Sequence, residues 1–186
     1  MYRSSVRATA PFVLMLCVLV YLNPFRIALP LLLAALLHEM GHYLALRLLG
    51  VPVYALTLTA LGARMSVGNS DVPRQIAATV SGPAVNAVCA AVMLRLYPTF
   101  SFCSFVLFLY NILPIYPLDG GRLLLLLAQQ WHLPNWPVRL VQSLTLAALA
   151  LGALLLTRSG ACGLWPVLLL AALAIRVALD AAAERR

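Results

Sequence analysis

Hydrophobic residues in this chain are gathered in long blocks, separated by short segments that contain the polar residues, Gly and Pro. Neither a period-2 alternation nor a 3.6-residue stripe runs through the blocks, and this is typical of membrane-spanning helices. The pattern predicts an all-α polytopic membrane protein, one domain over 1–186, with about six transmembrane helices. We expect these at 8–22, 27–49, 75–97, 101–127 (broken near 114–119), 139–157 and 162–179.

The first block follows two Arg residues and resembles the core of a signal peptide. The sequence after it, "YLNPFRIALP", has no small-x-small cleavage site. We therefore interpret residues 8–22 as a short membrane anchor.

Residues 51–73 interrupt the helical pattern. Residues 53–58 are rich in β-forming residues, Leu61 and Gly62 are suited to a turn, and "ARMSV" is suited to a return strand. We predict a short membrane-edge β-hairpin at about 53–67, with an ordinary cytosolic loop as the alternative. Backbone at the membrane face must be covered or reached by water.

Composition agrees with the membrane class, since 63% of residues are hydrophobic and 10% are charged, against about 45–50% and about 25% in soluble domains. The net charge of +8 comes from Arg residues scattered singly at block ends. We interpret them as charges that set topology, not as a nucleic-acid interface. Their distribution favours both termini in the cytosol.

The four Cys are far apart, which argues against a disulfide framework or a thiolate metal site.

The second block contains "LLHEMGHYL", with His38, Glu39 and His42 inside an apolar segment. On a helix, two His four residues apart lie on one face, about 6 Å apart along the axis. This is the HExxH pattern of zinc hydrolases, in which two ligands and a general base come from one helical turn. Ionisable groups within a spanning helix are costly and usually functional. The alternative is a neutral Glu39 with both His as interhelical contacts.

A catalytic zinc needs a third protein ligand. The remaining His132 lies among Trp and Pro residues typical of a membrane interface. Asp119, in "NILPIYPLDGGRLL", follows a block that Pro114 and Pro117 interrupt. We predict Asp119 as the third ligand, with an N-cap of the following helix as the alternative. Two carboxylates and neutral His side chains would balance the charge of Zn²⁺, which lessens the penalty of burial.

The motifs "HEMGH", "SGPAVN" and "NILPIYPLDGG", in this order, resemble the site-2 protease family of intramembrane zinc metalloproteases. The likeness is greatest to the stage IV sporulation protein FB type. The resemblance implies one zinc per chain, bound by His38, His42 and Asp119, with Glu39 as the base. It also implies that the SGPAVN segment, including Gly82, Pro83 and Asn86, lies close to the site. Asn86 and Asn111 are candidates for contacts to the substrate or oxyanion; Asn111 is alternatively a residue that positions the broken segment, and Asn86 a polar interhelical contact.

The resemblance implies cleavage of a membrane-associated protein near the cytosolic face, by a site that opens toward the cytosol. The expected substrate is a pro-sigma factor in sporulation, added as a strand to the hairpin, and inhibitory membrane partners are possible.

The sporulation type usually continues into a nucleotide-binding regulatory domain, whereas this chain stops at Arg186. No PDZ-like insertion interrupts the helices, which argues against the envelope-stress branch. The alternatives are a general site-2 protease that cleaves anti-sigma factors or remnant signal peptides, and a non-catalytic metal-binding membrane protein or transporter.

Overall fold

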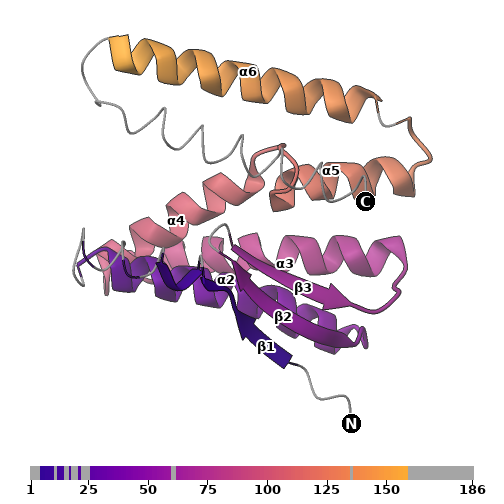
Figure 1. Ribbon diagram of the computed structural model, residues 1–186, viewed down its shortest axis with the longest axis horizontal. Helices are drawn as coiled ribbons and strands as arrows, with labels where there is room; N and C mark the ends of the chain where they lie inside the picture. The colour runs from indigo at the N-terminus through magenta and orange to yellow at the C-terminus, as the bar shows by residue number, and fades with distance from the viewer. Residues whose placement is uncertain are drawn as a thin grey trace. The chain divides into compact units, whose positions relative to one another are not determined.

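The computed structural model describes residues 5–10, 12–14, 17, 21, 26–59, 62–134 and 136–158. It divides into two compact units, Met1–Asn111 and Ile112–Arg186, which are described separately below. The elements of the first unit, seen in Figure 1, are β1 (Ser5–Ala8), α2 (Ala28–Leu48), β2 (Val53–Thr59), β3 (Gly62–Val67), α3 (Val72–Val92) and α4 (Pro98–Ile112). The second unit contains α5 (Asp119–Gln130) and α6 (Trp136–Arg158).

Helices α2 and α3 are each 21 residues long and mainly apolar. At 1.5 Å per residue they are roughly 31 Å long, close to the thickness of a bilayer core. Within the described residues they are the two helices long and apolar enough to cross a membrane. Helix α4 and residues 136–152 of α6 are apolar but shorter. The six spanning helices remain a prediction, and 162–179 lies outside the described residues, as do 11, 15–16, 18–20 and 22 within 8–22.

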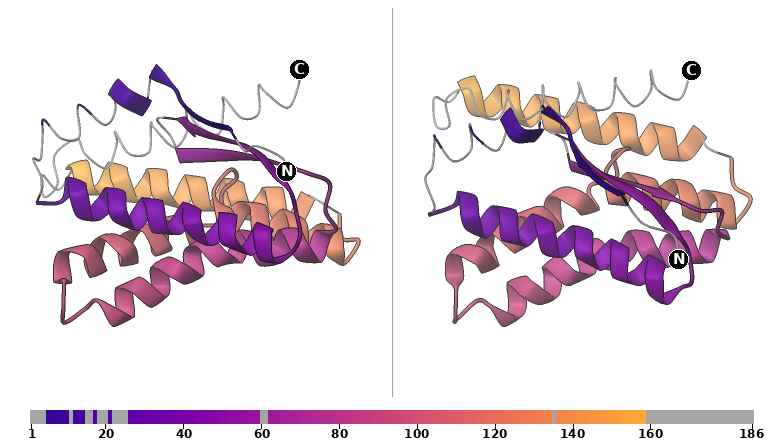
Figure 2. Two further views of the ribbon diagram at one scale, coloured as in Figure 1. Left: turned by 90° about the horizontal axis from the view of Figure 1, so that it is seen from below. Right: turned by 60° about the horizontal axis from the view of Figure 1, so that its bottom comes forward.

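A three-stranded sheet accompanies the helices of the first unit, with β2 in the centre. Strand β3 runs antiparallel to β2, which confirms the predicted hairpin. Strand β1 pairs with β2 in parallel, from Ser5 opposite Ala55 to Ala8 opposite Leu58. In the left panel of Figure 2 the strands lie on one side of α2 and α4 lies on the other.

Strand β1 corrects the prediction that the fold is all-α apart from one hairpin. Ala8 ends β1, and the next residue, Thr9, bonds to the Leu58 carbonyl through its backbone N–H at 3.0 Å and its hydroxyl at 2.9 Å. Four residues are too few to show an alternating pattern. The strand depends on a partner about fifty residues later in the chain, and local sequence does not reveal such a pairing.

The sheet and the helices share an apolar cluster at the C-terminal end of α2. Its buried members are Leu46, Val51, Val53 and Ala78, and Met65 and Val67 of β3 pack against it. Nearer the middle of α2, a Cβ atom on Gly41 would lie 2.9 Å from the carbonyl oxygen of Ser81 in α3. Helices α2 and α3 therefore approach closely because a residue without a side chain stands at their contact.

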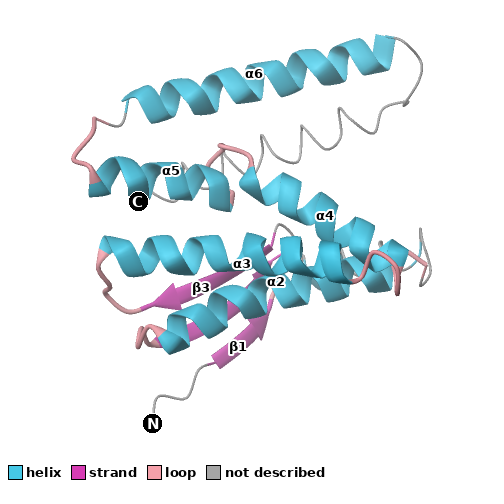
Figure 3. Ribbon diagram, turned by 180° about the vertical axis from the view of Figure 1, so that it is seen from behind, coloured by secondary structure: helices cyan, strands magenta, loops and turns pink. Residues whose placement is uncertain are grey.

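The chain between α4 and α5 is not helical, in the region where the two prolines predicted a break. Ile115 and Leu118 of this segment are almost completely buried and pack with Leu113, Leu146 and Leu149. Figure 3 shows α5 and α6 side by side, joined by a short connection. The buried apolar side chains hold the irregular segment against α6.

Two consecutive glycines let the irregular segment fold back on α5. A Cβ atom on Gly120 would lie 2.2 Å from the carbonyl oxygen of Ile112, and one on Gly121 would lie 2.2 Å from the carbonyl carbon of Ile115. Both contacts are with backbone, which has little freedom to move away. Both positions therefore require glycine, because a side chain at either would overlap backbone atoms.

We predict that Gly121→Ala lowers the thermal stability of the purified protein in detergent, because the added methyl overlaps the backbone of residues 115–116. The matched control is Gly152→Ala on α6, where no neighbouring atom of the described residues lies within 4 Å of the added atom. The control should melt at or above the wild-type temperature, since Ala is better than Gly in a helix by about 1 kcal/mol. Equal melting temperatures for the two variants would contradict this explanation of the glycine pair.

Candidate metal centre

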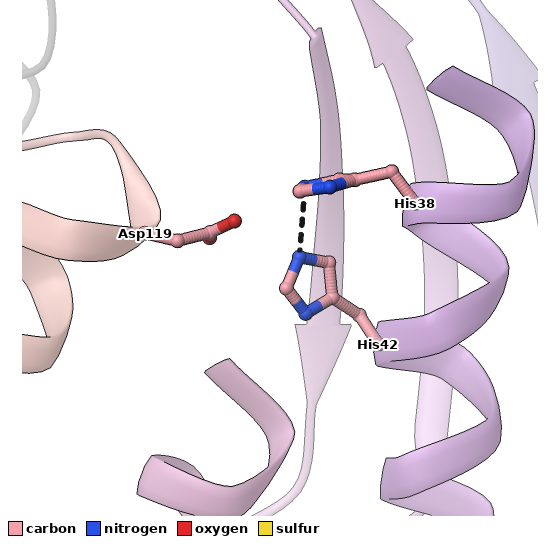
Figure 4. A group of neighbouring side chains, drawn as sticks. All are labelled: His38, His42 and Asp119. Atoms are coloured by element: carbon pink, nitrogen blue, oxygen red, sulfur yellow. Dashed lines mark hydrogen bonds between the residues drawn. The ribbon is translucent and has the colours of Figure 1, made fainter. Parts of the chain in front are cut away.

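Two histidines, one turn apart on α2, face one another. His38 is buried, with 6% of its surface exposed, and His42 is partly buried. The two Nε2 atoms are 3.1 Å apart, and the rings meet nearly at right angles with their centroids 4.7 Å apart. Figure 4 shows this pair, with a dashed line for the contact between the two nitrogens. The spacing of the HEMGH motif thus brings two potential ligand atoms together.

The tautomer of His42 is set by the backbone of α3. Its Nδ1 atom lies 2.7 Å from the carbonyl oxygen of Ala78. A carbonyl oxygen only accepts hydrogen bonds, so Nδ1 carries the proton and the lone pair of a neutral ring is on Nε2. The same carbonyl accepts the hydroxyl of Ser81 at 2.6 Å. His42 is therefore oriented as metal-binding histidines are in proteins.

Asn86, also on α3, contacts the other histidine. Its Nδ2 atom is 3.1 Å from Nδ1 of His38, and the residue is completely buried. Its Oδ1 atom is buried without a hydrogen-bond partner in the described part of the chain. The SGPAVN segment was expected to lie near the two histidines, and for Asn86 this is confirmed.

Gly82 supplies the space in which the His42 ring lies. A Cβ atom at this position would be 2.3 Å from Nε2 of His42 and 2.5 Å from its Cε1. Pro83 follows inside the helix and has no N–H to donate, so the hydrogen bonding of α3 is interrupted in this turn. The Gly-Pro pair of the SGPAVN motif therefore makes a gap and a local irregularity beside the imidazole.

The histidine pair fits a zinc ion. Two nitrogen ligands at about 2.05 Å from a tetrahedral zinc are separated by about 3.3 Å. The observed separation of the Nε2 atoms is 3.1 Å, and the proton of His42 is held on its other nitrogen. Donor type and spacing are thus those of two positions in a zinc site, and the tautomer of His42 is that of a ligand bound through Nε2.

The remaining predicted site residues are described within their own elements. Glu39 is a half-buried neighbour of His38 on α2. Asn111, on α4, donates a hydrogen bond from its amide to the Leu107 carbonyl at 3.1 Å, which is a contact within its own helix.

Asp119, drawn in Figure 4 as well, is the first residue of α5. Leu118 holds the N-cap position, and the cap makes no side-chain hydrogen bond. Asp119 therefore lies one residue beyond the N-cap position, in the first turn of the helix. Its carboxylate in the first turn still has a favourable interaction with the helix dipole.

Sequence reasoning missed the carbonyl group of Ala78 and the close approach at Gly41. Every residue has a carbonyl group, so no residue type in the sequence marks the one that accepts a bond from a histidine. The glycine inside HEMGH did carry a signal. A Gly in the middle of a helix is unfavourable and usually has a packing reason.

A helix suited to span a membrane, with a paired imidazole site supported by a second such helix, is typical of an intramembrane metalloprotease. The model of peptidase family M50 matches residues 57–155, slightly more than half of the chain. The chain therefore belongs to peptidase family M50, the site-2 protease family of membrane metallopeptidases. The matched stretch begins after the HEMGH motif and includes SGPAVN and the segment with Asp119.

The fold is also that of a solved structure in this class. The chain is similar to the site-2 protease from Methanocaldococcus jannaschii, with a TM-score of 0.68 and 20% sequence identity. The similarity covers 94% of this chain and 89% of that one. A comparison with curated proteins gives no match.

We predict that Gly82→Ala removes metal binding, because the methyl group would occupy the position of the His42 ring. The measurement is the zinc content of the purified protein, by elemental analysis after dialysis against a weak chelator. Gly152→Ala again serves as the control and should keep its metal. Full zinc occupancy in a folded Gly82→Ala protein would show that the His42 ring is not a ligand in this position.

Proposed function

We propose that the protein is an intramembrane zinc endopeptidase, with His38, His42 and Asp119 as ligands of one Zn²⁺ and Glu39 as the general base. The observation that carries the proposal is the convergence of two Nε2 atoms at 3.1 Å, with Nδ1 of His42 held by the Ala78 carbonyl. These residues belong to a chain of a metallopeptidase family, which favours a catalytic site over a purely structural pair of histidines.

Asp119 is our candidate for the third ligand for chemical reasons. His38, His42 and Asp119 are a group of side chains of the kinds that hold a metal ion. One aspartate ligand and an ionised Glu39 offset the double charge of the ion when both histidines are neutral. A site with no net charge is cheaper to place in a low-dielectric interior than a charged one.

When bound, zinc supplies a Lewis acid that brings the pKa of water near 7. Glu39 takes the proton of the attacking water on its carboxylate. The water oxygen then bonds to the peptide carbonyl carbon, the C–N bond breaks, and Glu39 returns the proton to the leaving nitrogen. Amide N–H groups of Asn86 and Asn111 are candidates to stabilise the negative charge that develops on the carbonyl oxygen. Water must reach the site, which requires a polar path from the cytosolic face.

The substrate needs an extended backbone, since a helix hides its peptide bonds. The sheet offers strand edges for pairing, and β2 is covered on both sides, by β1 and β3. We propose that the substrate adds as a strand to the outer edge of β3. This strand leads directly into α3, which carries Gly82 and Asn86.

Strand pairing also supports the proposed topology. Because β1 pairs with β2, residues 5–8 and 53–59 must lie on the same side of the membrane. The chain between them therefore crosses an even number of times, and α2 accounts for one crossing. We propose a multi-pass protein with both termini in the cytosol and the site toward the cytosolic face, in agreement with the Arg distribution.

The proposed substrate class is a membrane-associated protein, and the finer proposal is a pro-sigma factor in sporulation. It is supported by the likeness of "NILPIYPLDGGRLLLLL" to the stage IV sporulation protein FB type. The second candidate is a general site-2 protease that acts on anti-sigma factors or remnant signal peptides. The proposal of a pro-sigma factor as substrate also includes membrane partners that inhibit the protease. A transporter is disfavoured because a carboxylate with no ligand role, Glu39, lies beside the ligands.

We predict that Glu39→Gln abolishes cleavage while zinc stays bound, because the amide has the shape of the carboxylate but does not accept the proton. The assay is co-expression of the full chain with tagged membrane substrates, read by immunoblot. The substrates are a pro-sigma factor, an anti-sigma factor and a signal peptide, so that the cleaved one separates the two candidate functions. Cleavage by a zinc-loaded Glu39→Gln protein would refute the protease mechanism.

We predict that Asp119→Asn weakens zinc binding by more than about tenfold, because a neutral ligand replaces an anionic one. The control is Asp71→Asn, which removes an exposed carboxylate 3.2 Å from Arg74 at the start of α3. Competition with a fluorescent zinc chelator measures both affinities. If the two variants bind zinc equally well, Asp119 is not a ligand.

A further inference from the structure

Asn86 is a fully buried amide with only one of its two polar atoms paired. Its Nδ2 atom lies against Nδ1 of His38, and Oδ1 has no partner in the described part of the chain. A buried polar atom that makes no hydrogen bond is unfavourable, because it has lost its hydrogen bonds to water. Such a group in a native protein calls for a specific explanation.

The protonation of His38 at Nδ1 decides which atom of the Asn86 amide faces it. If His38 binds a metal through Nε2, a neutral ring carries its proton on Nδ1, which is then a donor. The Asn amide nitrogen is also a donor, and two donors do not bond. The oxygen and nitrogen of an amide have nearly the same shape, and the hydrogen-bond network determines which is which. Rotation of the amide by half a turn places the oxygen against Nδ1–H of His38.

We propose that Asn86 is a positioning residue, whose amide oxygen accepts the Nδ1–H of His38 and so directs Nε2 to the metal. This inference rests on the proposed zinc site. Asn86 then does for His38 what the Ala78 carbonyl does for His42. A histidine ligand generally donates its second N–H to such an acceptor, which fixes the ring and raises its basicity.

The arrangement of α3 agrees with this role. Ala78, Gly82 and Asn86 recur every four residues, so they lie along one side of the helix. Ala78 orients His42, Gly82 makes room for its ring, and Asn86 contacts His38. One stripe on α3 therefore supports both histidines of α2. In this orientation the amide NH₂ takes the place of the unpaired oxygen atom.

The tautomer of His38 can be measured without any change to Asn86. The zinc-loaded full-length protein is labelled with ¹⁵N-histidine, and His132→Asn removes the one other histidine. His132 is exposed with φ of 54°, which Asn tolerates. The NMR spectrum should show both remaining rings protonated on Nδ1 and metal-bound through Nε2. Protonation of His38 on Nε2 would overturn the proposal.

Variants of Asn86 test the acceptor directly. Asn86→Asp keeps an acceptor and should bind Zn²⁺ with close to wild-type affinity, whereas Asn86→Leu has none and should lose about 10–100-fold. Ser104→Ala is the matched control, because its hydroxyl is also buried and has no hydrogen-bond partner among the described residues. This variant should bind zinc as the wild type does. Competition with a fluorescent chelator in detergent micelles gives the affinities. If Asp weakens binding as much as Leu does, or if Leu has no effect, Asn86 does not act as an acceptor.

The same experiments separate this proposal from the proposed function. A wild-type protein that binds no zinc, or a Glu39→Gln protein that still cleaves, refutes the zinc protease. A wild-type protein that binds zinc and cleaves, with zinc affinity unchanged in Asn86→Leu, refutes only the role of Asn86.

Discussion

The site depends on the close contact between α2 and α3. Gly41 and Gly82 each stand where a methyl group would collide with the other helix or with a histidine ring. This contact brings the carbonyl of Ala78 and the amide of Asn86 within hydrogen-bond distance of the two imidazoles. Without these partners, the buried imidazole of His38 and the partly buried one of His42 would lose hydrogen bonds to water without replacement. The second helix therefore makes the HEMGH motif stable as well as chemically useful.

Much of this was predictable from local sequence. The two long apolar helices, the hairpin and the position of the break after α4 follow from block lengths, β-forming residues and prolines. The pairing of His38 with His42 follows from their spacing on a helix. The nearness of Gly82 and Asn86 to the histidines followed from the family resemblance.

Other features depended on contacts that local sequence does not record. Strand β1 exists because of a partner far along the chain, and its four residues carry no pattern of their own. The acceptor for His42 is a backbone carbonyl, which has no residue type to mark it. Local sequence does not reveal that backbone atoms fill the space beside Gly120 and Gly121. In each case a long-range or backbone contact decided the outcome.

X-ray absorption at the zinc edge of the purified full-length protein tests the central claim most directly. The proposed site predicts one zinc per chain with two imidazole nitrogens and oxygen ligands, and no sulfur. The four cysteines of the chain make sulfur a real alternative. A sulfur ligand, or a spectrum with fewer than two imidazoles, would contradict a zinc site built on His38 and His42.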